Sequence, residues 1–121
     1  MKLYTINATP VQSKQQYQSS LKGAMPSDKI LTDTEVAKFN DLAIAKYPAE
    51  VARILKSYAI NGFTIYEVQG YWQGKAERSF KIEIATEDSH FIMGELCNEL
   101  RDKYKQDSVM LTLPNGEVEF I

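Results

Sequence analysis

Two β-like runs, an amphipathic helical stretch and a third β-like run follow one another between residues 62 and 113, and this order constrains the fold most. The first two runs, at 63–72 and 77–86, are rich in β-branched and aromatic residues, and a turn at 73–76 containing Gly74 separates them. The helical stretch begins after Asp88 or Ser89, which are good N-cap residues. Its apolar stripe consists of Met93, Cys97, Leu100 and Tyr104.

The first half of the chain supplies one more strand and one more helical region. A strand is predicted at 2–8, and the polar stretch 10–29 is predicted to be a long flexible loop, either a lid over a site or a disordered connection. Thr32 and Glu35 form a capping box that begins a helical pattern reaching residue 61. Pro48 interrupts this pattern, so we expect one helix with a break or two helices in series. A turn at 114–116 leads into a short last strand at 118–121.

The sum is a β-α-β-β-α-β order with an extra C-terminal strand, which predicts an α+β, ferredoxin-like sandwich. With 121 residues, the chain is long enough for a single domain spanning 1–121. Helices in this fold cover one face of the sheet, yet the run 63–72 carries large groups on both faces. Tyr66, Val68 and Trp72 fall on one face, whereas Phe63, Ile65 and Tyr71 fall on the other. An apolar face without a cover favours a homo-oligomer.

Composition excludes several classes of function. Fourteen basic and sixteen acidic residues give a net charge of −2, and no basic stripe exists, so nucleic-acid binding is disfavoured. A single cysteine excludes an internal disulfide framework and fits a reducing cytoplasm. No run is apolar and long enough for a membrane span or a secretory signal. With one histidine as well, a structural zinc site is excluded, and no glycine-rich phosphate loop is present.

Acid–base chemistry is therefore left to carboxylates and tyrosines. Glu77 stands where the turn ends and a strand begins, and Tyr66 lies in the paired strand, so the hairpin can bring both to one small ligand. The alternative is that Glu77 is a solvated turn residue and Tyr66 a core aromatic. His90 is expected to be an exposed first-turn residue rather than a catalyst, and Cys97 a core residue rather than a nucleophile.

The same region resembles the phage-encoded enzymes that degrade S-adenosylmethionine, the SAM lyases. The matching features are KLYTINAT in the first strand, Gly70-Tyr71 at a strand end, Glu77-Arg78-Ser79 before an alternating strand, and the block LCNELRDKYKQDSVML. The resemblance covers residues 62 to 113 in sequence and the N-terminal half in layout. It implies a PII-like trimer whose ligand lies between neighbouring subunits.

The resemblance also implies an activity. Family members cleave S-adenosylmethionine into methylthioadenosine and homoserine lactone without metal or cofactor, because the sulfonium is already a good leaving group. A glutamate and a tyrosine of the central hairpin are the key polar residues, and by position they correspond to Glu77 and Tyr66. Tyr71 and Trp72 are expected to contact adenine or the sulfonium, and Ser79 is a further substrate-binding candidate.

Two classes of function follow for this chain. One is a SAM lyase that a phage uses in the host cytoplasm to deprive methylation and restriction systems of S-adenosylmethionine, with a host enzyme as a further partner left open. The other is a PII-like binding or inhibitory module that oligomerises around a small ligand without chemistry.

Overall fold

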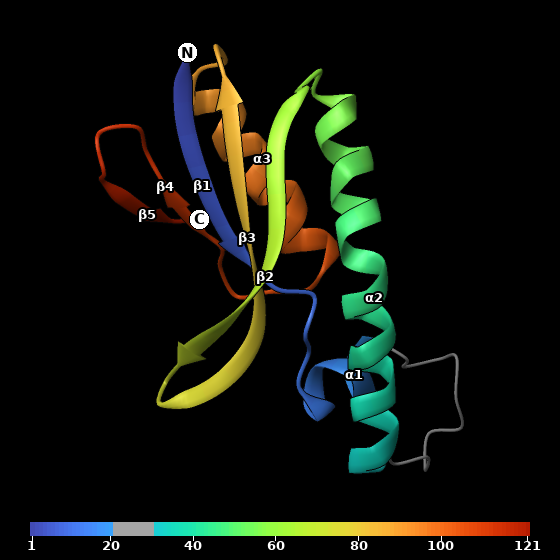
Figure 1. Cartoon of the computed structure of the whole chain (residues 1–121). Coiled ribbons are helices and arrows are strands. Elements are labelled where there is room, and N and C mark those ends of the chain that lie inside the picture. The colour runs from blue at the N-terminus through green and yellow to red at the C-terminus, as the bar shows by residue number, and fades with distance from the viewer. Residues whose placement is uncertain (21–30) are drawn as a thin grey trace.

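The computed structural model describes residues 1–20 and 31–121, which form five strands and three helices (Figure 1). In chain order these are β1 (Lys2–Ala8), α1 (Lys14–Ser20), α2 (Asp33–Ser57), β2 (Gly62–Trp72), β3 (Lys75–Thr86), α3 (His90–Lys103), β4 (Met110–Thr112) and β5 (Val118–Phe120). The last strand is one residue shorter than the predicted 118–121. None of the described helices is both long and apolar enough to cross a membrane.

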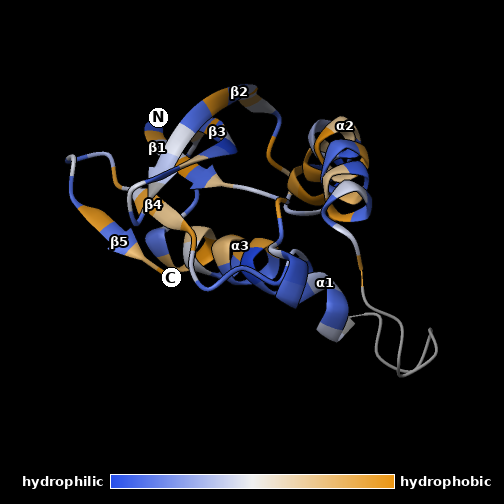
Figure 2. Ribbon diagram, turned by 90° about the horizontal axis from the view of Figure 1, so that it is seen from below, coloured by the Kyte–Doolittle hydropathy of each residue, from blue (hydrophilic) through white to orange (hydrophobic). Residues whose placement is uncertain are grey.

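The strands form one antiparallel sheet in the order β2-β3-β1-β4-β5. The first four of these strands have the ferredoxin-like arrangement, and β5 extends the sheet beside β4, so the predicted fold class is confirmed. Figure 2 shows α3 along one side of the strands, and no described helix lies over the opposite side. One face of the sheet is therefore covered, and we call the other one the open face.

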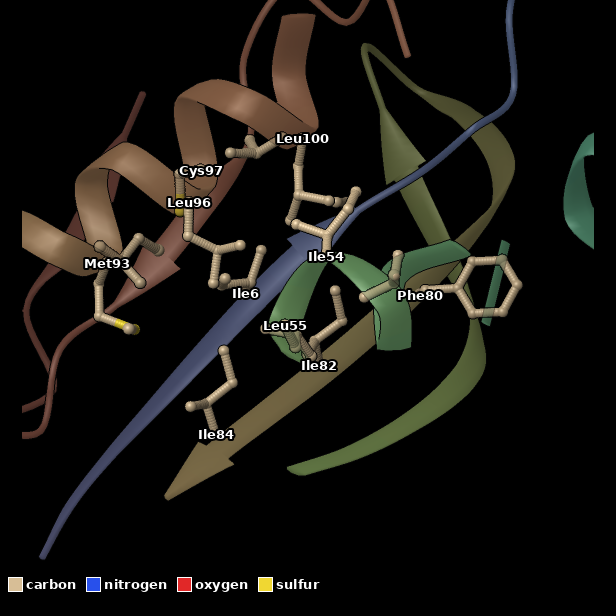
Figure 3. Close-up of a cluster of buried hydrophobic side chains, with 14 of the residues drawn as sticks. Ile6, Ile54, Leu55, Phe80, Ile82, Ile84, Met93, Leu96, Cys97 and Leu100 are labelled. Carbon is tan, nitrogen blue, oxygen red and sulfur yellow. The ribbon is translucent and has the colours of Figure 1, made fainter. Parts of the chain in front are cut away.

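The core lies between the covered face and the helices (Figure 3). Ile6 of β1 and Ile82 of β3 are fully buried there against residues of both long helices. Alternation along β3 makes this possible, since Phe80, Ile82 and Ile84 point to the core while the residues between them face the open side. The predicted stripe of α3, including Cys97, is buried in the same cluster.

Helix α2 begins as predicted and then runs without the expected break. The Thr32 hydroxyl accepts a hydrogen bond from the Glu35 amide at 3.1 Å, and the Glu35 carboxylate accepts one from the Thr32 amide at 3.2 Å. The helix continues through Pro48, although proline removes a helical hydrogen bond at a cost of about 3 kcal/mol. Tyr47 and Val51, on either side of Pro48, are both fully buried, so core packing offsets that cost.

The segment predicted to be a loop over 10–29 contains α1. Ser13 and Gln16 form a second capping box, in which Gln16 donates its amide to the Ser13 hydroxyl at 3.1 Å and Ser13 donates its amide to the Gln16 side chain at 2.7 Å. This S-x-x-Q pattern was present in the sequence and indicates the helix. Residues 21–30 lie outside the described part of the chain.

The β2–β3 hairpin is longer than predicted and has a tighter turn. Gln73 and Gly74 both have positive φ, 51° and 77°, so only these two residues make the turn and β3 begins at Lys75. Glu77 is therefore inside a strand rather than at its start. Residues 75–79 of β3 pair with β2 alone, because β1 pairs with β3 only from Phe80 onward. This free part of the hairpin, residues 68–79, is called the arm (Figure 1).

Candidate functional site

A groove of about 1140 Å³ follows the arm. Its walls come from the end of β1 and the segment after it, the first half of α2, the arm, and residues 106–108 with the open-face side chains of β4 and β5. Most of these segments are far apart in the sequence. A second hollow of about 450 Å³ lies on the arm itself, and Glu77 lines both.

Glu77 is half-buried on β3, and its partner in the ladder is Gly70. Since Gly70 has no side chain, no side chain stands opposite Glu77 on this face of the β2–β3 ladder. Burial raises the pKa of Glu77 above its ordinary value of 4.5. Within residues 1–20 and 31–121, Glu77 takes part in none of the ion pairs. A partly desolvated carboxylate without a basic partner is suited to receive a cationic group.

Tyr66 lies on the open face of β2, opposite Lys81, and is 38% exposed. Its hydroxyl donates a hydrogen bond to the carboxylate of Glu83, and this bond raises the pKa of the phenol. Tyr66 is thus a partly exposed residue whose hydroxyl has a defined hydrogen-bond partner, and it is not part of the core. From the sequence, Glu83 is one of several carboxylates of the second half that could carry acid–base chemistry, and only Glu77 was singled out among them by its position.

The hairpin does not bring Tyr66 and Glu77 together. Both face the open side, but they stand four ladder positions apart, since Tyr66 pairs with Lys81 and Glu77 pairs with Gly70. At about 3.3 Å per residue the two backbone positions are separated by about 13 Å. Within one subunit the two side chains therefore start from well-separated positions on the hairpin.

The other three predicted residues have different environments. Ser79 shares the open face with Glu77, but its hydroxyl donates to the carbonyl of Ala8 at 3.0 Å and so joins the arm to β1. Tyr71 is 71% exposed, pairs with Ala76 and lines the groove, and its hydroxyl accepts a hydrogen bond from the side-chain Nε2 of Gln69 at 3.1 Å. The backbone of Trp72 pairs with Lys75, and its side chain lies outside the described part of the structure.

Arg78 and Thr9 hold the arm, and sequence reasoning missed both roles. The Arg78 guanidinium contacts Glu67 at 2.8 Å and Asp41 of α2 at 3.1 Å. Its backbone carbonyl accepts a hydrogen bond from the Thr9 hydroxyl at 2.7 Å, and that hydroxyl accepts from the Val11 amide at 3.0 Å. Positions 9 and 78 are so distant in sequence that no local pattern indicates their contact.

His90 and Cys97 are not part of the groove. His90 is exposed at the start of α3, as predicted, and pairs with Glu119 of β5. Cys97 is fully buried, and burial raises its pKa to about 12, which keeps the thiol protonated and unreactive. Among the described residues, no group of three or more His, Cys, Asp or Glu side chains is arranged to hold a metal ion.

Comparison with known proteins identifies solved structures with a similar fold. No protein-family model matches the sequence, and none of the curated proteins is significantly similar to it. Among solved structures, a phage SAM lyase in its apo state matches with a TM-score of 0.55 and 19% identity, over 99% of this chain and 87% of that one. A phage SAM lyase in complex with S-methyl-5'-thioadenosine matches with a TM-score of 0.50 and 20% identity, over 99% and 88%. The resemblance stated from the sequence is thus confirmed at the level of the fold.

Proposed function

We propose that this chain is a SAM lyase that cleaves S-adenosylmethionine into methylthioadenosine and homoserine lactone. The observation that carries the proposal is the environment of Glu77, an open, half-buried carboxylate with a raised pKa at the wall of a groove of about 1140 Å³. A groove of this volume accommodates a nucleoside with an amino-acid chain. The fold likeness to phage SAM lyases, one of them holding methylthioadenosine, supports the same assignment.

The reaction needs positioning more than acid–base chemistry. The substrate's own carboxylate attacks its γ-carbon, the bond between that carbon and sulfur breaks, and the electron pair goes to sulfur, which leaves as a neutral thioether. Glu77 would balance the positive charge of the sulfonium or hold the ammonium, and Tyr66 would orient the chain by hydrogen bonding. Holding the methionine part folded supplies most of the rate increase, because a flexible chain rarely adopts the attacking geometry.

A second copy of the chain fits this proposal for two reasons. Leu3, Val118 and Phe120 are 56%, 49% and 64% exposed on the open face, which leaves apolar surface for another subunit to cover. The backbone positions of Tyr66 and Glu77 are also about 13 Å apart. A neighbouring subunit can bring its own Tyr66 or Glu77 to the same ligand. We propose a homotrimer with the ligand between subunits, as the family resemblance implies.

The same distance favours one alternative function. If each copy uses Glu77 and Tyr66 for separate contacts, the chain is a PII-like module that binds a small ligand or inhibits a host enzyme without cleaving anything.

For a lyase, the expected role is that of a phage protein acting in the host cytoplasm to deplete the cofactor of restriction and methylation enzymes.

The decisive experiment is to incubate the purified protein with S-adenosylmethionine and follow methylthioadenosine by chromatography. Glu77→Gln is the test variant, and Glu117→Gln, which removes an exposed carboxylate near the C-terminus, is the matched control. We expect turnover by the wild type and the control, and at least a tenfold loss in the Glu77 variant with its oligomeric state unchanged. Survival of the substrate with a trimer present would favour the binding module.

A further inference from the structure

One row of side chains crosses the whole open face. In the ladder, Tyr66 of β2 pairs with Lys81 of β3, Lys81 with Asn7 of β1, Asn7 with Met110 of β4, and Met110 with Phe120 of β5. Ladder partners point to the same side, so these five side chains lie next to one another across the sheet. Lys81 is the cationic member of the row and stands between Tyr66 and Asn7.

Lys81 lines the groove together with Asn7, Met110 and Phe120. Its side chain is half-buried, and within residues 1–20 and 31–121 none of the ion pairs includes it. The nearest carboxylate along the same face of β3, that of Glu83, already accepts the hydrogen bond from Tyr66. A cation in the wall of a groove with no ion-pair partner of its own is suited to an anionic group of the ligand.

Glu83 supplies the opposite charge. It is two residues from Lys81 on the same strand and on the same face, which puts their backbone positions about 7 Å apart. The Tyr66 hydroxyl fixes the Glu83 carboxylate by donating to it, and the second carboxylate oxygen keeps acceptor capacity. Lys81 and Glu83 thus offer one positive and one negative group on the same face. Their side chains are long enough for both charges to contact the two charged groups of one α-amino acid.

We infer that Lys81 and Glu83 bind the amino-acid end of the ligand, with Lys81 holding its carboxylate and Glu83 its ammonium. This inference rests on the proposed function in that the ligand carries an adenosine at one end and an amino acid at the other. Lys81 then selects ligands with a carboxylate, and it orients one carboxylate oxygen while the other is directed toward the γ-carbon. Of the two roles proposed for Glu77, this assignment leaves it the sulfonium, and Tyr66 orients the amino-acid chain through Glu83 as a positioning residue.

The test compares two ligands that share the thioether and adenosine but differ in the amino acid. Binding of S-adenosylhomocysteine, which carries the amino acid, and of methylthioadenosine, which lacks it, is measured by calorimetry for the wild type and three variants. Lys81→Met keeps the length of the side chain without its charge, and Glu83→Gln keeps the acceptor for Tyr66 without the charge. Lys46→Met, on an exposed turn of α2 that does not line the groove, controls for net charge.

We expect Lys81→Met to weaken S-adenosylhomocysteine binding about tenfold to a hundredfold, the usual effect of losing a hydrogen bond to a charged group, and to leave methylthioadenosine binding unchanged. Glu83→Gln should act in the same direction, and Lys46→Met should change neither. An unchanged preference for S-adenosylhomocysteine in Lys81→Met overturns the inference, as does an equal loss of both ligands.

The outcomes also separate this inference from the proposed reaction. If the wild type prefers S-adenosylhomocysteine through Lys81 but leaves S-adenosylmethionine intact, the binding site stands and the lyase proposal fails. If the wild type cleaves S-adenosylmethionine and Lys81→Met retains the full ligand preference, the lyase proposal stands and the role of Lys81 fails. A wild type that binds neither ligand overturns both.

Discussion

Replacing Thr9 with valine tests how the arm is held in place. The Thr9 side chain is only 6% exposed, and its hydroxyl donates to the Arg78 carbonyl at 2.7 Å while accepting from the Val11 amide at 3.0 Å. Valine has nearly the same shape as threonine, so the substitution removes both hydrogen bonds without leaving a cavity. It also replaces the hydroxyl beside these two backbone groups with a methyl group, which neither accepts nor donates.

The expected cost follows from these two contacts. A hydrogen bond contributes about 0.5–1.5 kcal/mol net to the free energy of unfolding. Because Thr9 is nearly inaccessible to water, we expect each of its two bonds to contribute in the middle of this range or above. We therefore expect Thr9→Val to lower the free energy of unfolding by about 2 kcal/mol and the melting temperature by about 8 °C. Because Arg78 adjoins Glu77, the arm should also be less well positioned, and the turnover of S-adenosylmethionine that we propose should fall.

Urea unfolding followed by circular dichroism measures the effect, with Thr64→Val as the matched control because Thr64 is an exposed threonine of β2. The control should stay within about 0.5 kcal/mol of the wild type. The reasoning is refuted if Thr9→Val is as stable as the control, since the bonds through the Thr9 hydroxyl would then contribute nothing to holding the arm.

Two further predictions concern ionisation. Burial raises the pKa of Glu77, so the folded state binds its proton more tightly than the unfolded state, and stability should fall as pH rises from 4.5 through that raised pKa. Thermal melts across this range should show a weaker fall for Glu77→Gln than for the wild type, and identical slopes would contradict the shift. Cys97, with a pKa of about 12, should resist iodoacetamide at neutral pH in the folded protein and react after unfolding in urea. Mass spectrometry reads out both states, and rapid labelling of the folded protein would show that the thiol is accessible.

Local patterns in the sequence were enough to predict the core and the order of the elements, with the exception of α1. The capping box of Thr32 and Glu35, the stripe of α3 that includes Cys97, and the alternation of Phe80 and Ile82 all depend on residues a few positions apart. Caps and periodicity act over this short range, so they can be recognised without coordinates. Helix α1 was equally accessible through Ser13 and Gln16, and the polar composition of that segment obscured it.

The candidate site was predicted only in part. The position of Glu77 near the hairpin turn indicated a residue with a special environment, and the structure places it at the wall of the groove. No role was predicted for Lys81, because a lysine in an alternating strand is indistinguishable in sequence from an ordinary residue of the exposed face. Only the pairing of β3 with both β1 and β2 puts it between Asn7 and Tyr66.

The sequence by itself thus determined which residues form helices, which form strands and which of their faces are apolar. The tertiary structure decided what depends on contacts between distant residues: the continuity of α2 through Pro48, the bond from Thr9 to Arg78 across 69 positions, and the four ladder positions between Tyr66 and Glu77. The physical reason is that propensity and capping are local free energies. Register and burial are set by the whole sheet and its core, and they can outweigh local preferences such as that of a proline.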